Sequence, residues 1–235
     1  MRFRDEGYIT SLRKYGENSV IITLASKSHG LIKGFVRGGF SKKNLGLYQM
    51  GNLINVDCYA RLEENMLSFK PELIRSFVPD FMSNPQKTAA LSAMCSLLNS
   101  CLPENENFEW FYKYIENFFT QSDWLVHYAF FEFYLLEYLG VGIDLSKCAV
   151  TSSVKNLAYV SPKTARAVCL EKGFPYRDRL FLYPHFIVDK NYTPEREKVA
   201  DLLKMTGFFL NKNFFLVHDL KFPLNRANLM GILNL

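Results

Sequence analysis

The chain has 235 residues, of which 49% are apolar and 15% aromatic, and its formal net charge is +5 at pH 7. This length is enough to bury a sizeable core in one large or two small domains, and the composition excludes a disordered chain. Apolar runs stay below about 18 residues, and residues 1–10 lack the apolar stretch of a signal peptide, so we expect a cytoplasmic protein without a membrane-spanning helix.

The first third of the chain has the pattern of a small β domain. Short runs rich in β-branched and aromatic residues are separated by turns containing Gly, Ser and Asn. They predict five strands, at residues 8–12, 20–24, 31–36, 53–59 and 66–69. Strands this short and this closely spaced favour a closed barrel, because closure buries one face and removes the exposed edges.

Beyond about residue 79 the apolar residues recur with a helical period instead. The predicted helices span residues 87–102, 108–119, 124–139, 194–209 and 223–233. Between them, residues 144–184 are irregular, with an extended run at 157–160 and a short helix at 162–173. The prediction is therefore an α+β chain of two domains, a five-stranded closed barrel at 1–79 and a mostly helical domain at 80–235.

Positive charge is concentrated in the predicted barrel. Residues 1–79 contain 12 Lys and Arg against 7 Asp and Glu, whereas residues 80–235 contain 16 of each. Lysine and arginine interleaved with aromatic residues on a small barrel are typical of single-strand binding, since cations neutralise phosphates and rings stack on bases. The alternative is a solvated basic face whose aromatic residues, Tyr8, Tyr15, Phe35 and Phe40, belong to the core. The candidate phosphate contacts are Arg13, Lys14, Lys33, Arg37, Lys42 and Lys43.

Motifs for catalysis or nucleotide binding are incomplete. Residues 34–39 have the glycine spacing of a phosphate loop, but Phe40 stands where the phosphate-binding lysine is needed. The Gly140-Val141-Gly142 run has Leu145 at the place of the third glycine of a dinucleotide motif, and it follows a predicted helix rather than a strand. We predict no catalytic residues, and an enzyme acting on an anionic substrate is the least favoured alternative.

Several stretches, in the same order along the chain, resemble the recombination mediator RecO family. DEGYITSLRKYGENSVIITLASKSHG and LIKGFVRGGFSKKNLGLYQMGNLINVD are similar to its N-terminal domain, LEYLGVGIDLSKCAVTSSVKNLAYVSPKTARAV and PYRDRL to its middle, and residues 206–210 with Pro223 and Arg226 to its C-terminal helices. The resemblance implies an OB-fold barrel followed by a helical domain. It also implies a bacterial cytoplasmic protein, associated with the nucleoid when active, that works in DNA repair and recombination.

The same resemblance implies partners and a mode of action. RecO proteins bind single- and double-stranded DNA, anneal complementary strands, act with RecR, and recognise the acidic C-terminal tail of single-strand binding protein (SSB). Together these proteins help to load RecA, and RecO hydrolyses no nucleotide. The alternative is a protein-interaction adaptor of the repair machinery with only weak DNA binding, whose pocket for the tail would lie within residues 87–102 and 194–215.

One departure from the family concerns zinc. Many RecO proteins carry four zinc-binding cysteines in the region that corresponds to residues 148–170. Cys148 stands where the first ligand would be, but Thr151 breaks the Cys-x-x-Cys pair, and Cys169 has no other cysteine within three residues. We therefore expect no zinc or other cofactor, and residues 144–184 form a degenerate zinc-module region.

Overall fold

The computed structural model describes residues 1–39, 41, 44, 46–61, 66–189 and 191–234. The chain divides into two compact units, Met1–Lys113 and Tyr114–Leu235. The domain boundary predicted at residues 79–80 stays a prediction. Among the described residues, helices are too short or too polar to cross a lipid bilayer.

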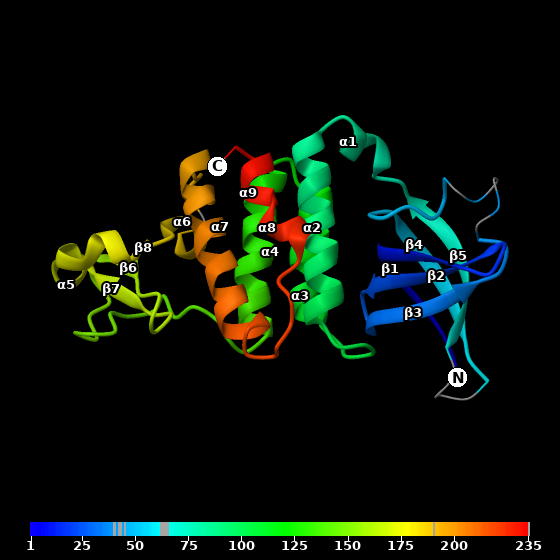
Figure 1. The fold of residues 1–235 in the computed structure, drawn as a ribbon, viewed down its shortest axis with the longest axis horizontal. Helices are drawn as coiled ribbons and strands as arrows, with labels where there is room; N and C mark the ends of the chain where they lie inside the picture. The colour runs from blue at the N-terminus through cyan, green and yellow to red at the C-terminus, as the bar shows by residue number, and fades with distance from the viewer. Residues whose placement is uncertain (40, 42–43, 45, 62–65, 190, 235) are drawn as a thin grey trace. The chain divides into compact units, whose positions relative to one another are not determined.

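The N-terminal unit contains the predicted five-stranded, OB-like sheet (Figure 1, blue to cyan). Hydrogen bonding joins the strands in the order β1-β2-β3-β5-β4, and β4 pairs with β1, so that the sheet closes on itself. Neighbours are antiparallel except for β3 and β5. The predicted α+β class is confirmed, and β1 and β5 are longer than predicted. The strands are β1 (Arg2–Tyr15), β2 (Ser19–Ser26), β3 (Gly30–Val36), β4 (Leu53–Tyr59) and β5 (Leu67–Arg75).

The interior of this sheet is mostly aliphatic, because alternate residues of each strand face inward and most of these are Ile, Val or Leu. Ile22 and Leu24 of β2 are completely buried in it, as is Val56 of β4. Gly34 of β3 lies against the ring of Phe69, where an added Cβ would come within 2.2 Å of the ring. A side chain at residue 34 would therefore displace the aromatic ring from the core.

Two helices follow the strands in this unit, α1 (Val78–Met82) and α2 (Pro85–Cys101). The side chain of Asn84 caps α2 by accepting a hydrogen bond of 3.0 Å from the N–H of Lys87, and α2 ends before Pro103, as predicted. Asn99 of α2 donates a 3.1 Å hydrogen bond to the carbonyl of Thr10 in β1, and the hydroxyl of Thr10 donates to Asn99 in return. These bonds fix the C-terminal half of α2 against the outside of the sheet.

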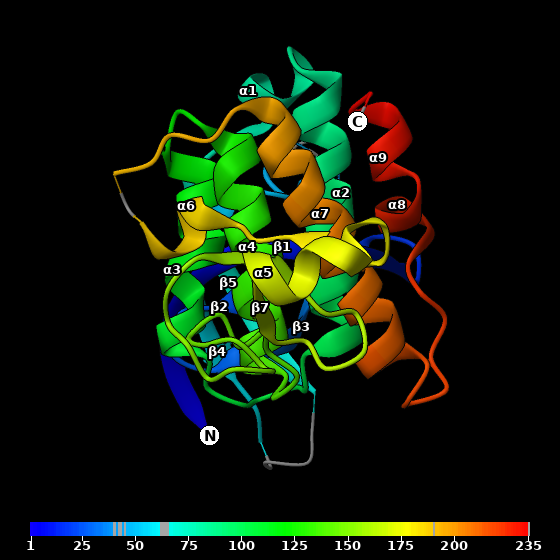
Figure 2. The ribbon, with the colours of Figure 1, turned by 90° about the vertical axis from the view of Figure 1, so that its left-hand side faces the viewer.

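The second unit is built around two long helices that pack side by side, α4 and α7 (Figures 1 and 2). Inside it, Arg226 donates a 2.8 Å hydrogen bond to the carboxylate of Glu132, and both side chains are buried. This ion pair attaches the C-terminal segment to α4. The boundary between the two units, after Lys113, falls within α3, the helix that precedes α4. The helices are α3 (Glu109–Thr120), α4 (Trp124–Tyr138), α7 (Arg196–Leu210), the π-helical η2 (Asn211–Phe215), α8 (Leu224–Ala227) and α9 (Leu229–Ile232).

Residues 144–184 form what we call the small-sheet module, a three-stranded sheet in the order β7-β6-β8. The helix predicted at residues 162–173 is wrong for most of its length. Ala165 has a φ of 53°, and the chain turns there so that Ala167 pairs with Val160. Tertiary pairing thus outweighs the helical pattern. The elements are β6 (Leu157–Val160), β7 (Ala167–Cys169), α5 (Leu170–Gly173), η1 (Phe174–Arg179) and β8 (Phe181–Leu182), with α6 (His185–Val188) after them.

Candidate nucleic-acid interface

An open groove of about 460 Å³ lies on the outer face of β1, β2 and β3, and we call it the β1–β3 groove. Arg13 comes from β1 and Lys33 from β3, with two residues of β2 between them, because Arg13 pairs with Ile21 and Lys33 with Thr23. Two of the predicted phosphate contacts thus share one groove on the strands that OB folds use for oligonucleotides. The groove is lined by Ser11, Arg13, Ile21, Thr23, Leu31, Lys33, Met66, Asn99, Leu102 and Glu104.

The other predicted cations are not part of the groove lining. Lys14 is exposed on β1 but follows Arg13, so it points to the opposite side of the strand. Arg37 is exposed in the turn directly after β3. Lys14 pairs with Val20 and Val20 with Val36, so that Lys14 and Arg37 lie at the same end of the sheet. Lys42 and Lys43 lie outside the described residues.

Glu104 is the charged residue of the groove lining that the sequence analysis did not predict. Its carboxylate forms an ion pair with Lys33, with 2.5 Å between Nζ and Oε1, and both side chains are about half exposed. Exposed pairs of this kind contribute only about 0–1 kcal/mol, so a phosphate can displace the carboxylate. The residues are 71 positions apart, and an isolated parallel bridge between Leu31 and Glu104 helps to bring them together.

Two of the four interleaved aromatic residues lie beside the groove. Tyr15 and Phe35 pack edge to face with 5.6 Å between ring centroids, and Tyr15 is 55% exposed. Tyr8 is only 2% exposed and packs against Phe77, so it is a core residue as the alternative predicted. Phe40 lies outside the described residues. Among the described residues, Tyr15 therefore offers an exposed aromatic ring close to the cations.

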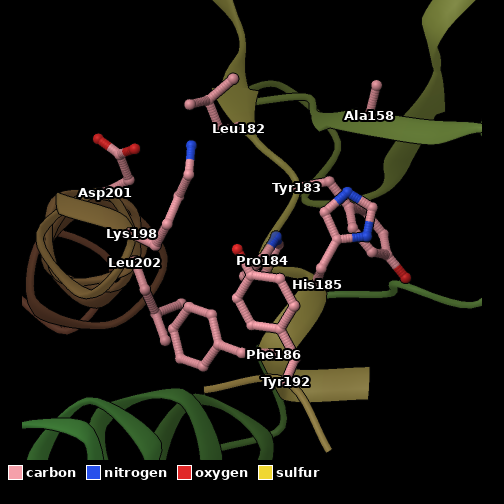
Figure 3. Close-up of a pocket in the computed structure, with 10 residues that line it drawn as sticks. All are labelled: Ala158, Leu182, Tyr183, Pro184, His185, Phe186, Tyr192, Lys198, Asp201 and Leu202. Carbon is pink, nitrogen blue, oxygen red and sulfur yellow. The ribbon is translucent and has the colours of Figure 1, made fainter. Parts of the chain in front are cut away.

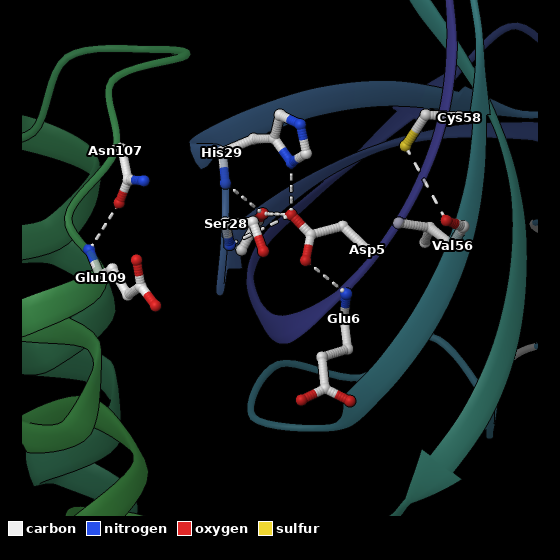
Figure 4. A network of polar contacts seen from close by, with 9 residues as sticks. Asp5, Glu6, Ser28, His29, Val56, Cys58, Asn107 and Glu109 are labelled. Atoms are coloured by element: carbon white, nitrogen blue, oxygen red, sulfur yellow. Dashed lines mark hydrogen bonds and ion pairs between the residues drawn. The ribbon is translucent and has the colours of Figure 1, made fainter.

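A polar network stabilises the turn between β2 and β3 (Figure 4). The buried carboxylate of Asp5 accepts hydrogen bonds from the hydroxyl of Ser26 and the N–H groups of Glu6 and Ser28, and it lies 2.6 Å from His29 Nδ1. Burial raises the pKa of Asp5, but these hydrogen bonds together outweigh burial and lower it. Ser26 donates to Asp5 rather than to His29, so the group lacks the nucleophile–base contact of a hydrolase.

The small-sheet module contains a cluster of two sulfur atoms and a hydroxyl at the predicted zinc-module position. Cys148 Sγ accepts hydrogen bonds from the N–H groups of Cys169 at 3.3 Å and Val150 at 3.4 Å. Thr151 Oγ1 lies 3.9 Å from Cys169 Sγ. Burial raises the pKa of Cys148, whereas hydrogen bonds from Thr151, Cys169 and Val150 lower it to about 6. Two thiols do not complete a tetrahedral zinc site, and the absence of zinc stays a prediction.

A second cavity, of about 140 Å³, lies in the C-terminal unit between α7 and the segment around α6 (Figure 3). Phe186 and Tyr192 form its apolar side with Leu202 of α7, while Lys198 and Asp201 of α7 contribute opposite charges. Part of this lining falls within residues 194–215, where a pocket for an acidic tail was predicted, and the remainder comes from residues 158–192.

Comparison with known families gives matches along most of the chain. Residues 1–77 match the model of the recombination protein O N-terminal domain, and residues 82–215 match that of the recombination protein O C-terminal domain. The first match covers the barrel strands, and the second contains the small-sheet module and the helices α4 and α7. The groove and the sulfur cluster therefore both lie inside matched regions.

Curated relatives match over nearly their full length. DNA repair protein RecO of Wolbachia sp. subsp. Drosophila simulans (strain wRi) is 36% identical over 95% of this chain and 96% of its own. The RecO proteins of Bartonella quintana (strain Toulouse), at 34% identity, and Rickettsia canadensis (strain McKiel), at 35%, cover 99% and 92% of this chain and 97% and 90% of their own. An OB-like sheet, a helical C-terminal unit and these matches lead to one conclusion: the chain belongs to the RecO family and has a role in DNA repair and recombination.

Proposed function

We propose that the chain binds single- and double-stranded DNA at the β1–β3 groove and the cations beside it, and that it anneals complementary strands. The observation that carries the proposal is the position of Arg13 and Lys33 on opposite sides of one groove, with the exposed ring of Tyr15 nearby. Cations on both sides of a groove neutralise the phosphates of a strand that lies along it, and an exposed ring stacks on a base whatever its identity.

Annealing requires mainly charge neutralisation. Two DNA strands repel each other until cations reduce the phosphate charge, and base pairing then supplies the energy of the product. No covalent bond is made or broken in this process, so the proposed activity is not enzymatic. Within the family setting, we propose that the chain acts with RecR on SSB-coated DNA and helps to load RecA.

The first test is the salt dependence of single-strand binding. If about 4–6 phosphates are neutralised, the log of the affinity should fall with the log of salt concentration with a slope of about −3 to −4. Replacing Arg13, Lys33 and Arg37 together with alanine should reduce the slope to about −1 to −2 and weaken binding to all sequences alike. A slope near zero for the unaltered protein in a fluorescence titration would exclude the proposal.

The ion pair of Lys33 gives a second test, in which the substitution should strengthen DNA binding rather than weaken it. Glu104→Gln removes the carboxylate that competes with a phosphate for Lys33, so single-strand binding should become about two- to fivefold tighter at low salt. Glu116→Gln is the matched control, because it removes the same charge from an exposed position on α3 that does not line the groove. Equal affinity changes in the two variants would show that overall charge, and not the groove, controls binding.

The second cavity favours a companion function as a protein adaptor. Its apolar side, formed by Phe186, Tyr192 and Leu202, suits a hydrophobic residue, and Lys198 at its edge suits an acidic one. We propose that it takes the acidic, Phe-ended tail of SSB. Titration with the tail peptide should show binding that is lost without the terminal Phe and weakened by Lys198→Ala. Binding that persists in both experiments would place the tail elsewhere.

A further inference from the structure

A second cationic region lies in the C-terminal unit. Residues 144–184 contain seven Lys and Arg against three Asp and Glu, although residues 80–235 as a whole are balanced. The small-sheet module therefore carries excess positive charge, and the other residues of 80–235 carry the compensating acids. Six of the seven cations are exposed: Lys147, Lys155, Lys163, Lys172, Arg177 and Arg179.

The exposed aromatic residues of the module lie on the same short element as two of these arginines. All six residues of η1 are exposed, including Phe174 at 54% and Tyr176 at 61%. The guanidinium of Arg177 lies over the ring of Phe174, 4.8 Å from its centroid. Two rings at such exposure, side by side with cations, are available for contact with another molecule.

The module holds η1 firmly in place. Gly173, which precedes η1, is so close to the ring of Tyr159 in β6 that an added Cβ would lie 2.3 Å from it. At the start of α5, the N–H of Leu170 donates a 2.8 Å hydrogen bond to the carbonyl of Asn156. The exposed rings are therefore presented by a packed support, which reduces the entropy that is lost when a ligand binds.

The acids beside these cations do not neutralise them strongly. Arg177 contacts Asp178 at 3.9 Å and Lys172 contacts Glu171 at 3.2 Å, each between sequence neighbours with exposed carboxylates. Such pairs contribute about 0–1 kcal/mol and are readily replaced by a phosphate.

From these observations we propose that η1 and the cations around it form a second binding surface for single-stranded nucleic acid. The inference rests on the proposed function, and it supplies what annealing requires: a place for the second strand. Phosphates would contact Arg177 and Arg179, and a base would stack on Tyr176 or Phe174. Exposed rings favour a nucleic acid over an acidic peptide, because flat bases stack on them whereas carboxylates do not.

Strand bridging, which is the capture of a second DNA strand by protein already bound to a first, tests this inference. One oligonucleotide is fixed to beads and loaded with protein, and a labelled second oligonucleotide that is not complementary to the first is then added. The unaltered protein should capture the second strand. The variant Tyr176→Ala/Arg177→Ala/Arg179→Ala should bind a single strand within about threefold of the unaltered protein, but capture of the second strand and the annealing rate should fall at least about tenfold.

The matched control is Lys204→Ala/Lys221→Ala, which removes two exposed positive charges outside the module and should leave bridging unchanged. Bridging and annealing at the unaltered rate in the η1 variant would overturn the inference while leaving the groove proposal intact. The inference also fails if the η1 variant loses only the binding of an acidic peptide. A complete lack of single-strand binding by the unaltered protein would overturn the proposed function and this inference together.

A crosslinking experiment locates the contact directly. Oligonucleotides that contain 5-iodouracil crosslink to nearby aromatic side chains on irradiation. A crosslinked peptide that contains Tyr176 supports the proposed surface, whereas crosslinks confined to the peptide that contains Tyr15 contradict it.

Discussion

The N-terminal sheet and the C-terminal helical unit place their polar groups differently. The sheet has a mostly aliphatic interior, and its polar network around Asp5 lies at the turn between β2 and β3. The helical unit instead contains a charged pair in its interior, Glu132 with Arg226. The carboxylate of Glu132 also accepts hydrogen bonds from the hydroxyls of Thr206 and Tyr128. The first arrangement joins residues near one turn, while the second joins residues 94 positions apart.

The difference reflects how the backbone N–H and C=O groups of each unit find hydrogen-bond partners. Strands of a closed sheet are held to each other by backbone hydrogen bonds, so the interior needs only apolar packing. In its described residues, up to 234, the segment that contains α8 and α9 has only four-residue helices and pairs with no strand. Arg226 compensates for this by donating to the carboxylate of Glu132 and to the carbonyl of Leu203. A buried ion pair thus attaches a segment with little regular structure.

Breaking the buried pair is expected to have the largest effect. Glu132→Ala leaves the guanidinium of Arg226 buried without its carboxylate, which should lower the free energy of unfolding by about 3–5 kcal/mol. Urea unfolding in a Trp110→Phe background measures this, because Trp124 then reports on the C-terminal unit.

The control in the other unit is Glu72→Ala in a Trp124→Phe background, where Trp110 reports on the N-terminal unit. It removes the exposed partner of Arg4 and should cost less than about 1 kcal/mol. The double variant Glu132→Leu/Arg226→Leu should be more stable than Glu132→Ala, because no charge remains buried. If Glu132→Ala and Glu72→Ala lower the free energy of unfolding equally, the contrast between the two units is contradicted.

A smaller and pH-dependent effect is expected from Asp5→Asn. Since the folded sheet lowers the pKa of Asp5 below its usual 3.8, the carboxylate stabilises the fold above about pH 4, and this contribution is lost as the pH falls through the folded-state value. The variant should be less stable at pH 7 by about 1–3 kcal/mol, and the difference should shrink toward pH 2. Urea unfolding across this range measures it, with Asp57→Asn as the more exposed control. A pH-independent difference would show that packing, and not charge, is responsible.

The smallest effect is expected from removing metal. Dialysis against a chelator should leave the unfolding midpoint of the unaltered protein unchanged, because Cys148 and Cys169 are two ligands where a structural zinc site needs four. Thr151→Cys/Lys172→Cys restores the spacing of two Cys-x-x-Cys pairs and should bind zinc, so it serves as the positive control. Stoichiometric zinc in the unaltered protein, measured by mass spectrometry, would overturn the expectation.

Local patterns in the sequence are enough to predict much of this fold. Alternation of apolar residues places β4 at residues 53–59, and a proline after Leu102 correctly ends α2. The same patterns place Lys33 within the third predicted strand and Arg13 directly after the first. These features depend on neighbours within a few residues, where sequence periodicity and backbone geometry are directly linked.

Tertiary structure decides the features that depend on distant partners. Pairing with β6 converts residues 167–169 from predicted helix to strand, and packing against Phe77 takes Tyr8 out of the candidate interface. It also brings Glu104 to Lys33, so that Lys33, a predicted phosphate contact, is in an ion pair in the free protein. Composition and spacing alone thus predict that the barrel is basic, whereas strand register determines which of its cations share a groove, because register is set by hydrogen bonds between residues far apart in the chain.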